Sequence, residues 1–136
     1  MPQFIGSGLT LQGLRSEDFV YTWNITGTAG VNPGVGVPMS QDITANASAK
    51  VPADGDFILG ELRSYENRVQ EAVIVGAIAH KGNFTWPYTG VAPTRGGQVV
   101  ASATPGSVKT VISAIGNYTR VVEVDIVAAT VTVMLG

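Results

Sequence analysis

The stretch that decides the fold is T-R-V-V-E-V-D-I-V-A-A-T-V-T-V-M-L, which spans residues 119–135. Val122, Val124 and Ile126 alternate with two acidic residues, and a second alternation of valine and threonine follows after a short turn. Alternation with a period of two places each set of side chains on a different face of a β-strand. The stretch therefore predicts a β-hairpin in which Val122, Val124 and Ile126 face the core.

Strand patterns separated by turns continue upstream of this hairpin. Residues 57–65 and 69–79 predict a second hairpin with its turn at 66–68, and β-branched residues at both ends of the segment favour it. The rival interpretation is a helix over 61–71, in which glutamates and arginines would pair one turn apart. Further strands are expected over 19–23, 98–102 and 108–112 and edge strands at 35–40 and 84–88, while 41–53 is left without a predicted element.

The composition agrees with a β-rich chain. Of 136 residues, 41 are Val, Ile or Thr and only six are Leu, while Gly and Pro together number 24. A helical bundle needs the reverse balance, and a disordered chain has fewer apolar residues and more net charge. The seven to nine short strands predict an all-β fold: a small β-barrel or β-sandwich of short antiparallel strands with long loops. We expect an extended N-terminal arm over 1–18 and a single β-rich domain over 19–136.

The charge balance argues against two classes of partner. Eight Lys and Arg face ten Asp and Glu, so no basic surplus indicates binding to nucleic acid. The longest uncharged stretch, 19–41, contains too many glycines and prolines for a membrane span, and the N-terminus lacks the pattern of a secretion signal. Seven of the 18 charged residues lie between 54 and 71. We interpret the scarcity of charge elsewhere as surface that meets other protein, because the centres of interfaces are depleted in charge.

Few residues suit catalysis or metal binding. The chain has no cysteine, and His80 is its only histidine, which we expect to lie exposed in a turn. The acid pairs Asp54/Asp56 and Glu123/Asp125 are better explained as a turn and as the solvent-facing side of a strand than as acid–base or metal-binding groups. The sequence therefore predicts no enzyme, no cofactor and no metal site.

Two segments carry alternating aromatic residues. Phe19, Tyr21 and Trp23 form the first, and Phe84, Trp86 and Tyr88 the second. Such rows can stack against bases or sugars, but no basic residues lie between them. Packing in the core or at a subunit interface is therefore the favoured interpretation.

The segment 35–82 resembles the small decoration (cement) proteins of tailed-phage capsids. The resemblance lies in a small polar stretch, a D-G-D turn at 54–56, an I-L-G strand at 58–60, an E-N-R-V-Q-E turn at 66–71 and a V-G strand that ends at the K-G of 81–82. The closing hairpin, R-V-V-E-V-D at 120–125 and T-V-T-V-M-L at 130–135, is similar as well. Residues 1–34 and 84–94 depart from the pattern.

The resemblance implies a virion structural protein without enzymatic activity. It would bind the outer surface of an assembled capsid and stabilise it, with the major capsid protein as its partner and synthesis in the host bacterial cytoplasm. It also implies a homo-oligomer, with a trimer favoured. The apolar residues of the arm and of the second aromatic segment have no obvious core partner in the predicted hairpins. We therefore expect these to contact the capsid or another copy: Phe4, Ile5, Leu9, Leu11, Leu14, Phe84, Trp86 and Tyr88.

Three alternatives to a decoration protein stay open from the sequence. A tail-tube or fibre module would share the β-rich composition. A carbohydrate-binding β-sandwich would use the aromatic row at 84–88 as its sugar platform. The least favoured alternative is a hydrolase that depends on the carboxylates of Asp54 and Asp56.

Overall fold

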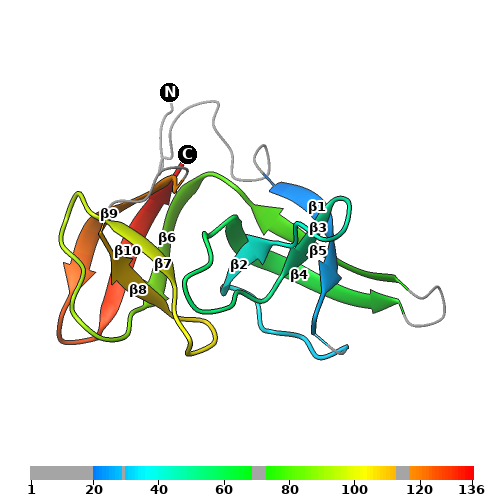
Figure 1. Cartoon of the computed structure of the whole chain (residues 1–136), viewed down its shortest axis with the longest axis horizontal. Helices are drawn as coiled ribbons and strands as arrows, with labels where there is room; N and C mark the ends of the chain where they lie inside the picture. Colours follow the sequence, from blue (N-terminus) through cyan, green and yellow to red (C-terminus); the bar gives the residue numbers. More distant parts are fainter. Residues whose placement is uncertain (1–19, 29, 69–72, 113–116) are drawn as a thin grey trace, which may run out of the picture.

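A computed structural model describes residues 20–28, 30–68, 73–112 and 117–136. Within these ranges the chain forms ten strands and no helix, so the all-β prediction is confirmed (Figure 1). The strands are β1 (Val20–Thr26), β2 (Pro38–Gln41), β3 (Ser48–Lys50), β4 (Gly60–Arg68), β5 (Val73–Ala79), β6 (Gly82–Pro87), β7 (Gln98–Ala101), β8 (Val108–Val111), β9 (Thr119–Asp125) and β10 (Thr130–Leu135). The described residues include no helix with the length and hydropathy of a membrane span.

The first five strands close into a barrel in the order β1-β3-β2-β4-β5, here called the N-terminal barrel. The β4–β5 hairpin confirms the expected pairing and excludes the rival helix for residues 61–68. Strand β4 extends to Arg68, so residues 66–68 belong to the strand and not to the expected turn. The connection at 69–72 lies outside the described residues. One pair, β1 with β3, is parallel, which departs from the purely antiparallel expectation.

Strand β2 is paired on both sides in the wall of the barrel, although an edge strand was expected at 35–40. It pairs with β4 through Pro38 and Met39 and with β3 through Ser40 and Gln41. Proline cannot donate to a ladder, but Pro38 is the first residue of the strand, where the missing N–H is tolerated. The barrel core comprises Ile25, Met39, Ala49, Leu62 and Ile78.

Two glycines allow β4 and β5 to approach closely. A Cβ on Gly60 would lie 2.2 Å from the carbonyl oxygen of Ala79, and one on Gly76 would lie 2.7 Å from that of Ser64. No side chain fits at such distances, so both positions require glycine for space. The glycines of the I-L-G and V-G patterns thus lie where β4 and β5 approach each other closely.

The remaining strands form the C-terminal lobe, with the sheets β6-β10-β9 and β7-β8. The backbone of Val121 in β9 exchanges two hydrogen bonds with Gly96 and Gly97, just before β7, at 2.8 and 2.9 Å. Tyr88, after β6, bridges Val108 of β8. These contacts link the two sheets around a common core, and β6 is an edge strand of its sheet, as its proline predicted.

A β-bulge in the closing hairpin changes which residues face that core. Val133 is opposite Val121, while Thr132 is opposite Glu123, so Val122 is an extra residue in β9. Val121 is buried and Val124 packs against the core, whereas Val122 and Ile126 are exposed. The predicted hairpin is confirmed, but the prediction that Val122 and Ile126 face inward is wrong. The bulge displaces Val122 from the inward-facing series. Ile126 lies beyond the end of β9, in the turn before β10.

The two parts lie side by side and share packed residues (Figure 1). Ile58, just before β4, and Ala79, the last residue of β5, belong to the core cluster of the C-terminal lobe. Gly55 and Asp56 exchange hydrogen bonds with Ala101 of β7 at 2.9 and 3.0 Å. A single domain over 19–136 stays a prediction, and this shared contact is what makes it testable. The arm at 1–18, with Phe4, Ile5, Leu9, Leu11 and Leu14, lies outside the described residues.

Candidate functional site

The second aromatic row lies mainly in the core. Phe84 and Trp86 are buried and their rings stack with centroids 5.6 Å apart, while Tyr88 is partly buried against the same cluster. Their alternation places them on the inner face of β6, where they fill the C-terminal lobe. The expected interface role of Phe84 and Trp86 is therefore corrected, because side chains buried within the chain offer no surface to a partner or a sugar.

A buried carboxylate fixes the Trp86 ring. The indole N–H donates to Glu61 Oε2 at 3.1 Å, and Arg63 lies 3.4 Å from Glu61 Oε1. The Arg63 guanidinium also lies 5.7 Å from the centroid of the Phe84 ring. Burial raises the pKa of Glu61 above its usual value, against the opposing effects of Arg63 and of the indole hydrogen bond. Glu61 thus joins β4 of the barrel to β6 of the lobe through the Trp86 indole.

His80 is half-buried, which corrects the expectation of an exposed turn residue. The Trp23 indole N–H donates to His80 Nε2 at 2.9 Å, and the Tyr21 and Trp23 rings lie 5.3 and 5.5 Å from the imidazole. Burial lowers the pKa of His80. Because Nε2 accepts this hydrogen bond, it holds the middle of β1 to the residue that follows β5 and is not free to act as a base.

Three of the four residues in the acidic pairs have structural partners within the described chain. Asp54 lies 2.8 Å from Lys109, and Asp56 lies 3.1 Å from Lys50 and accepts the Ala53 amide. Asp125 accepts the amide of Ala128 at 3.1 Å and so closes the turn after β9. Among the described residues, no group of three or more His, Cys, Asp or Glu is placed to hold a metal ion.

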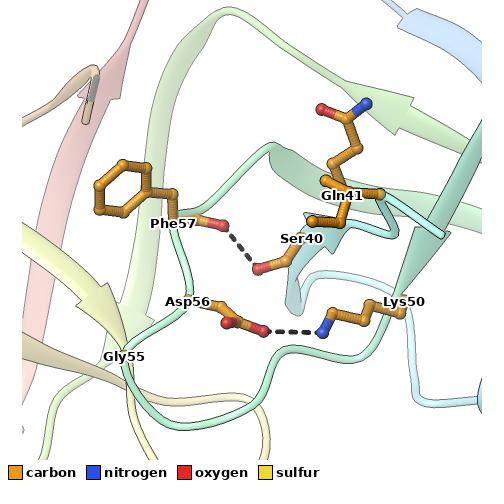
Figure 2. Close-up of a pocket in the computed structure, with 7 residues that line it drawn as sticks. Ser40, Gln41, Lys50, Gly55, Asp56 and Phe57 are labelled. Carbon is orange, nitrogen blue, oxygen red and sulfur yellow. Dashed lines mark hydrogen bonds and ion pairs between the residues drawn. The ribbon is translucent and has the colours of Figure 1, made fainter.

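A hollow of about 410 Å³ lies between the barrel rim and the 54–57 turn (Figure 2). The residues that line it are Ser40, Gln41, Ile43, Lys50, Gly55, Asp56 and Phe57. The Ser40 hydroxyl donates to the Phe57 carbonyl at 2.6 Å, and Figure 2 shows this bond beside the Lys50–Asp56 ion pair. The Phe57 ring points away from that pair. The Ser40 hydroxyl and the charges of Lys50 and Asp56 are thus paired within the hollow, and none of them is an activated nucleophile.

The surface carries several large apolar side chains that nothing in the described chain covers. Val127 is 99% exposed, Ile112 93%, Ile43 88% and Val91 79%. Single exposed apolar residues are ordinary, but these sit at turns and loop ends, where polar residues are usual. The I-V-A-A segment at 126–129 could have indicated exposed apolar residues in a turn. It was overlooked because the alternation of Val122, Val124 and Ile126 assigned Ile126 to the core.

Two of these residues flank a groove at the end of β9. The groove has a volume of about 300 Å³ and is lined by Ala92, Pro93, Thr94, Arg95, Val124 and Ile126; we call it the distal groove. Val91 directly precedes the lining residue Ala92 and Val127 directly follows Ile126, and both side chains are exposed. Asp125 and a hydrogen bond from the Tyr88 amide to the Ala129 carbonyl, 3.1 Å long, hold the adjoining turn. The groove is thus mainly apolar, with Thr94 and Arg95 as its polar lining residues, and the turn beside it is held by hydrogen bonds.

Comparison with family models, with curated proteins and with solved structures finds no match for this chain.

Proposed function

We propose that this chain is a structural protein of a phage particle that binds the outer surface of the assembled capsid and stabilises it. The observation that carries the proposal is the set of exposed apolar side chains on fixed turns, above all Val127 and Ile126 beside the distal groove. Exposed apolar side chains beside a groove are a feature of protein-binding surfaces. The resemblance of 35–82 to capsid decoration proteins supplies the kind of partner, the major capsid protein.

Capsid stabilisation needs binding alone. A protein that binds the assembled lattice but not its separate subunits shifts the equilibrium towards the lattice by mass action. A rigid β-scaffold favours such binding, because few side chains and loops lose freedom when it docks. The pairing of the acidic residues and the commitment of His80 to Trp23 agree with a role in binding and not in catalysis.

The first experiment is immunogold labelling of purified virions with an antibody against this chain. We expect label on the outside of the head. Label confined to the tail would favour the tail-tube or fibre alternative, and the absence of label from intact particles would contradict the proposal.

A second experiment tests the surface. Capsids that lack the protein are mixed with the wild-type chain, with Val127→Asp at the distal groove, or with Ile43→Asp at the opposite part of the molecule. We expect Val127→Asp to reduce co-sedimentation about tenfold or more, since a buried unpaired charge is costly, and Ile43→Asp to bind like the wild type. Weak binding by Ile43→Asp and normal binding by Val127→Asp would place the docking site at the barrel rim. Equal binding by all three chains would contradict an apolar docking surface.

The role of the arm is tested separately. Phe4, Ile5, Leu9, Leu11 and Leu14 are expected to contact the capsid or another copy, so deletion of residues 1–18 should weaken co-sedimentation. Undiminished binding by the shortened chain would exclude that role and leave the distal groove as the docking surface.

A further inference from the structure

The outer face of the sheet β6-β10-β9 is exposed and carries two opposite charges. Arg120 and Glu123 of β9 are opposite Met134 and Thr132 of β10 in the ladder. The residues between them in sequence, Val121 on β9 and Val133 on β10, point into the core. Because directly opposed residues share a face, both charges lie on the side of the sheet away from that core.

The β-bulge adds an apolar residue between these charges. Val122 and Met134 are each 39% exposed on this outer side. A regular strand would have left only one residue between inward-facing Val121 and the next inward-facing position, whereas the bulge leaves Val122 and Glu123. The face therefore has an apolar centre with a cation on one side and an anion on the other.

Arg120 and Glu123 differ from most charged residues of the chain. Lys50, Arg63 and Lys109 each form an ion pair with an acid. Within the described ranges, neither Arg120 nor Glu123 forms one. The sheet thus presents two opposite charges that have no ion-pair partner among the described residues.

We infer that this face binds the same face of a second copy of the chain about a two-fold axis. An axis that passes near Val122 places Arg120 of each copy against Glu123 of the other, so that one contact repeats twice. A two-fold interface must be self-complementary in this way. Opposite charges three residues apart on either side of an apolar centre satisfy that condition, and the net charge of the four groups is zero.

The inferred contact differs from the oligomer expected from the resemblance. A single two-fold contact produces a dimer, whereas a trimer needs a different interface. It is also separate from the distal groove, so the dimer stands or falls independently of capsid binding.

The test exchanges the two charges in the full chain and measures the dimer Kd by sedimentation equilibrium. We expect Arg120→Glu and Glu123→Arg each to raise the Kd roughly tenfold or more, because both repeats of the contact then bring like charges together. The double variant R120E/E123R restores opposite charges across the axis and should return the Kd towards that of the wild type. Arg68→Glu, an equal charge change at the distant end of β4, should leave the Kd unchanged.

A mixture provides the sharper result. Arg120→Glu carries two acids on the face and Glu123→Arg two bases, so an equimolar mixture of these weak dimers should form a stable heterodimer. Circular dichroism of each variant verifies that it is folded. A wild-type chain that stays monomeric at millimolar concentration overturns the inference. It is equally overturned by single reversals that leave the Kd unchanged, or by a mixture that associates no better than its components.

Discussion

At the residue scale, both indole N–H groups of this chain connect elements that are distant in sequence. Trp23 donates to His80, 57 residues away, and Trp86 donates to Glu61, 25 residues away. A buried polar group is costly unless it is hydrogen-bonded, so each pair constrains the two elements it joins. Neither partner could be identified from the sequence, because alternation predicts which face a residue takes but not what lies across from it.

The His80 contact predicts how stability depends on pH. Burial holds the folded-state pKa of His80 below its usual 6.5, so the unfolded chain takes up a proton first as the pH falls. The free energy of unfolding should be unaffected by His80 above pH 6.5 and should decrease as the pH drops from there towards the folded-state pKa. Urea denaturation at pH 8 and pH 5.5 measures this difference.

The control for that measurement is His80→Gln, which does not titrate and retains an acceptor for the Trp23 N–H. It also separates His80 from Glu61, whose raised pKa changes stability in the opposite direction as the pH falls. An identical pH dependence in the wild type and the glutamine variant would show that His80 contributes nothing to it.

The Glu61 contact predicts a difference between two substitutions. Glu61→Leu should lower the free energy of unfolding by about 2 kcal/mol, because it leaves the N–H of fully buried Trp86 without an acceptor. Glu61→Gln preserves an acceptor oxygen and removes a charge that burial disfavours, so it should stay within about 1 kcal/mol of the wild type. Urea denaturation compares them, and equal losses would mean that the indole bond is unimportant.

At the element scale, the sequence predicted the strands with clear alternation and missed those imposed by their neighbours. Strands β4, β5, β7, β8, β9 and β10 are close to the expected segments. Strand β3 was missed because its residues Ser48, Ala49 and Lys50 have little β-propensity, and pairing with β1 and β2 extends them. The bulge at Val122 was equally hidden, since one additional residue leaves no mark in the composition of a strand.

The same limit applies to the candidate site. Ile126 was assigned to the core by its spacing, but β9 ends at Asp125, and Ile126 lies with Val127 in the exposed turn that follows. Phe84 and Trp86 were correctly expected to alternate, but their partners Val99, Val108 and Val121 come from three other strands. Periodicity could therefore show that the row was apolar, and only the tertiary structure could show whether core or partner covers it.

The close approach of β4 and β5 predicts the effect of a single methyl group. Gly60→Ala should lower the free energy of unfolding by about 3 kcal/mol, because the new Cβ would collide with the backbone carbonyl of Ala79. Gly36→Ala is the control, since a Cβ there meets open space and only its positive φ of 95° costs about 1 kcal/mol. Denaturation midpoints that rank the two variants in the opposite order would contradict the steric explanation.

At the scale of the whole molecule, the barrel and the lobe are connected through a shared core. Ile58 packs in the cluster of the C-terminal lobe although the chain continues from it directly into β4 of the barrel. Hydrogen bonds at Gly55, Asp56 and Glu61 cross the same boundary. Two parts that share buried residues should lose their structure together, which is what a single domain over 19–136 would mean.

That expectation can be measured with one tryptophan in each part. Trp86→Phe leaves Trp23 as the reporter for the barrel, and Trp23→Phe leaves Trp86 as the reporter for the lobe. In each variant the fluorescence midpoint should coincide with the midpoint from circular dichroism, which follows all the strands. Separate midpoints within one variant would show that the parts unfold independently and that the chain holds two domains.

The closure of the barrel also has a consequence during protein synthesis. Strand β1 ends at Thr26, but its antiparallel partner β5 ends only at Ala79. Translation at about 5–20 residues per second separates the two by roughly 3 to 11 seconds. For that interval one edge of β1 has no partner within its own chain, and an unpaired edge is a template for aggregation. We therefore expect the soluble yield of this protein to depend on how quickly, and at what temperature, it is translated.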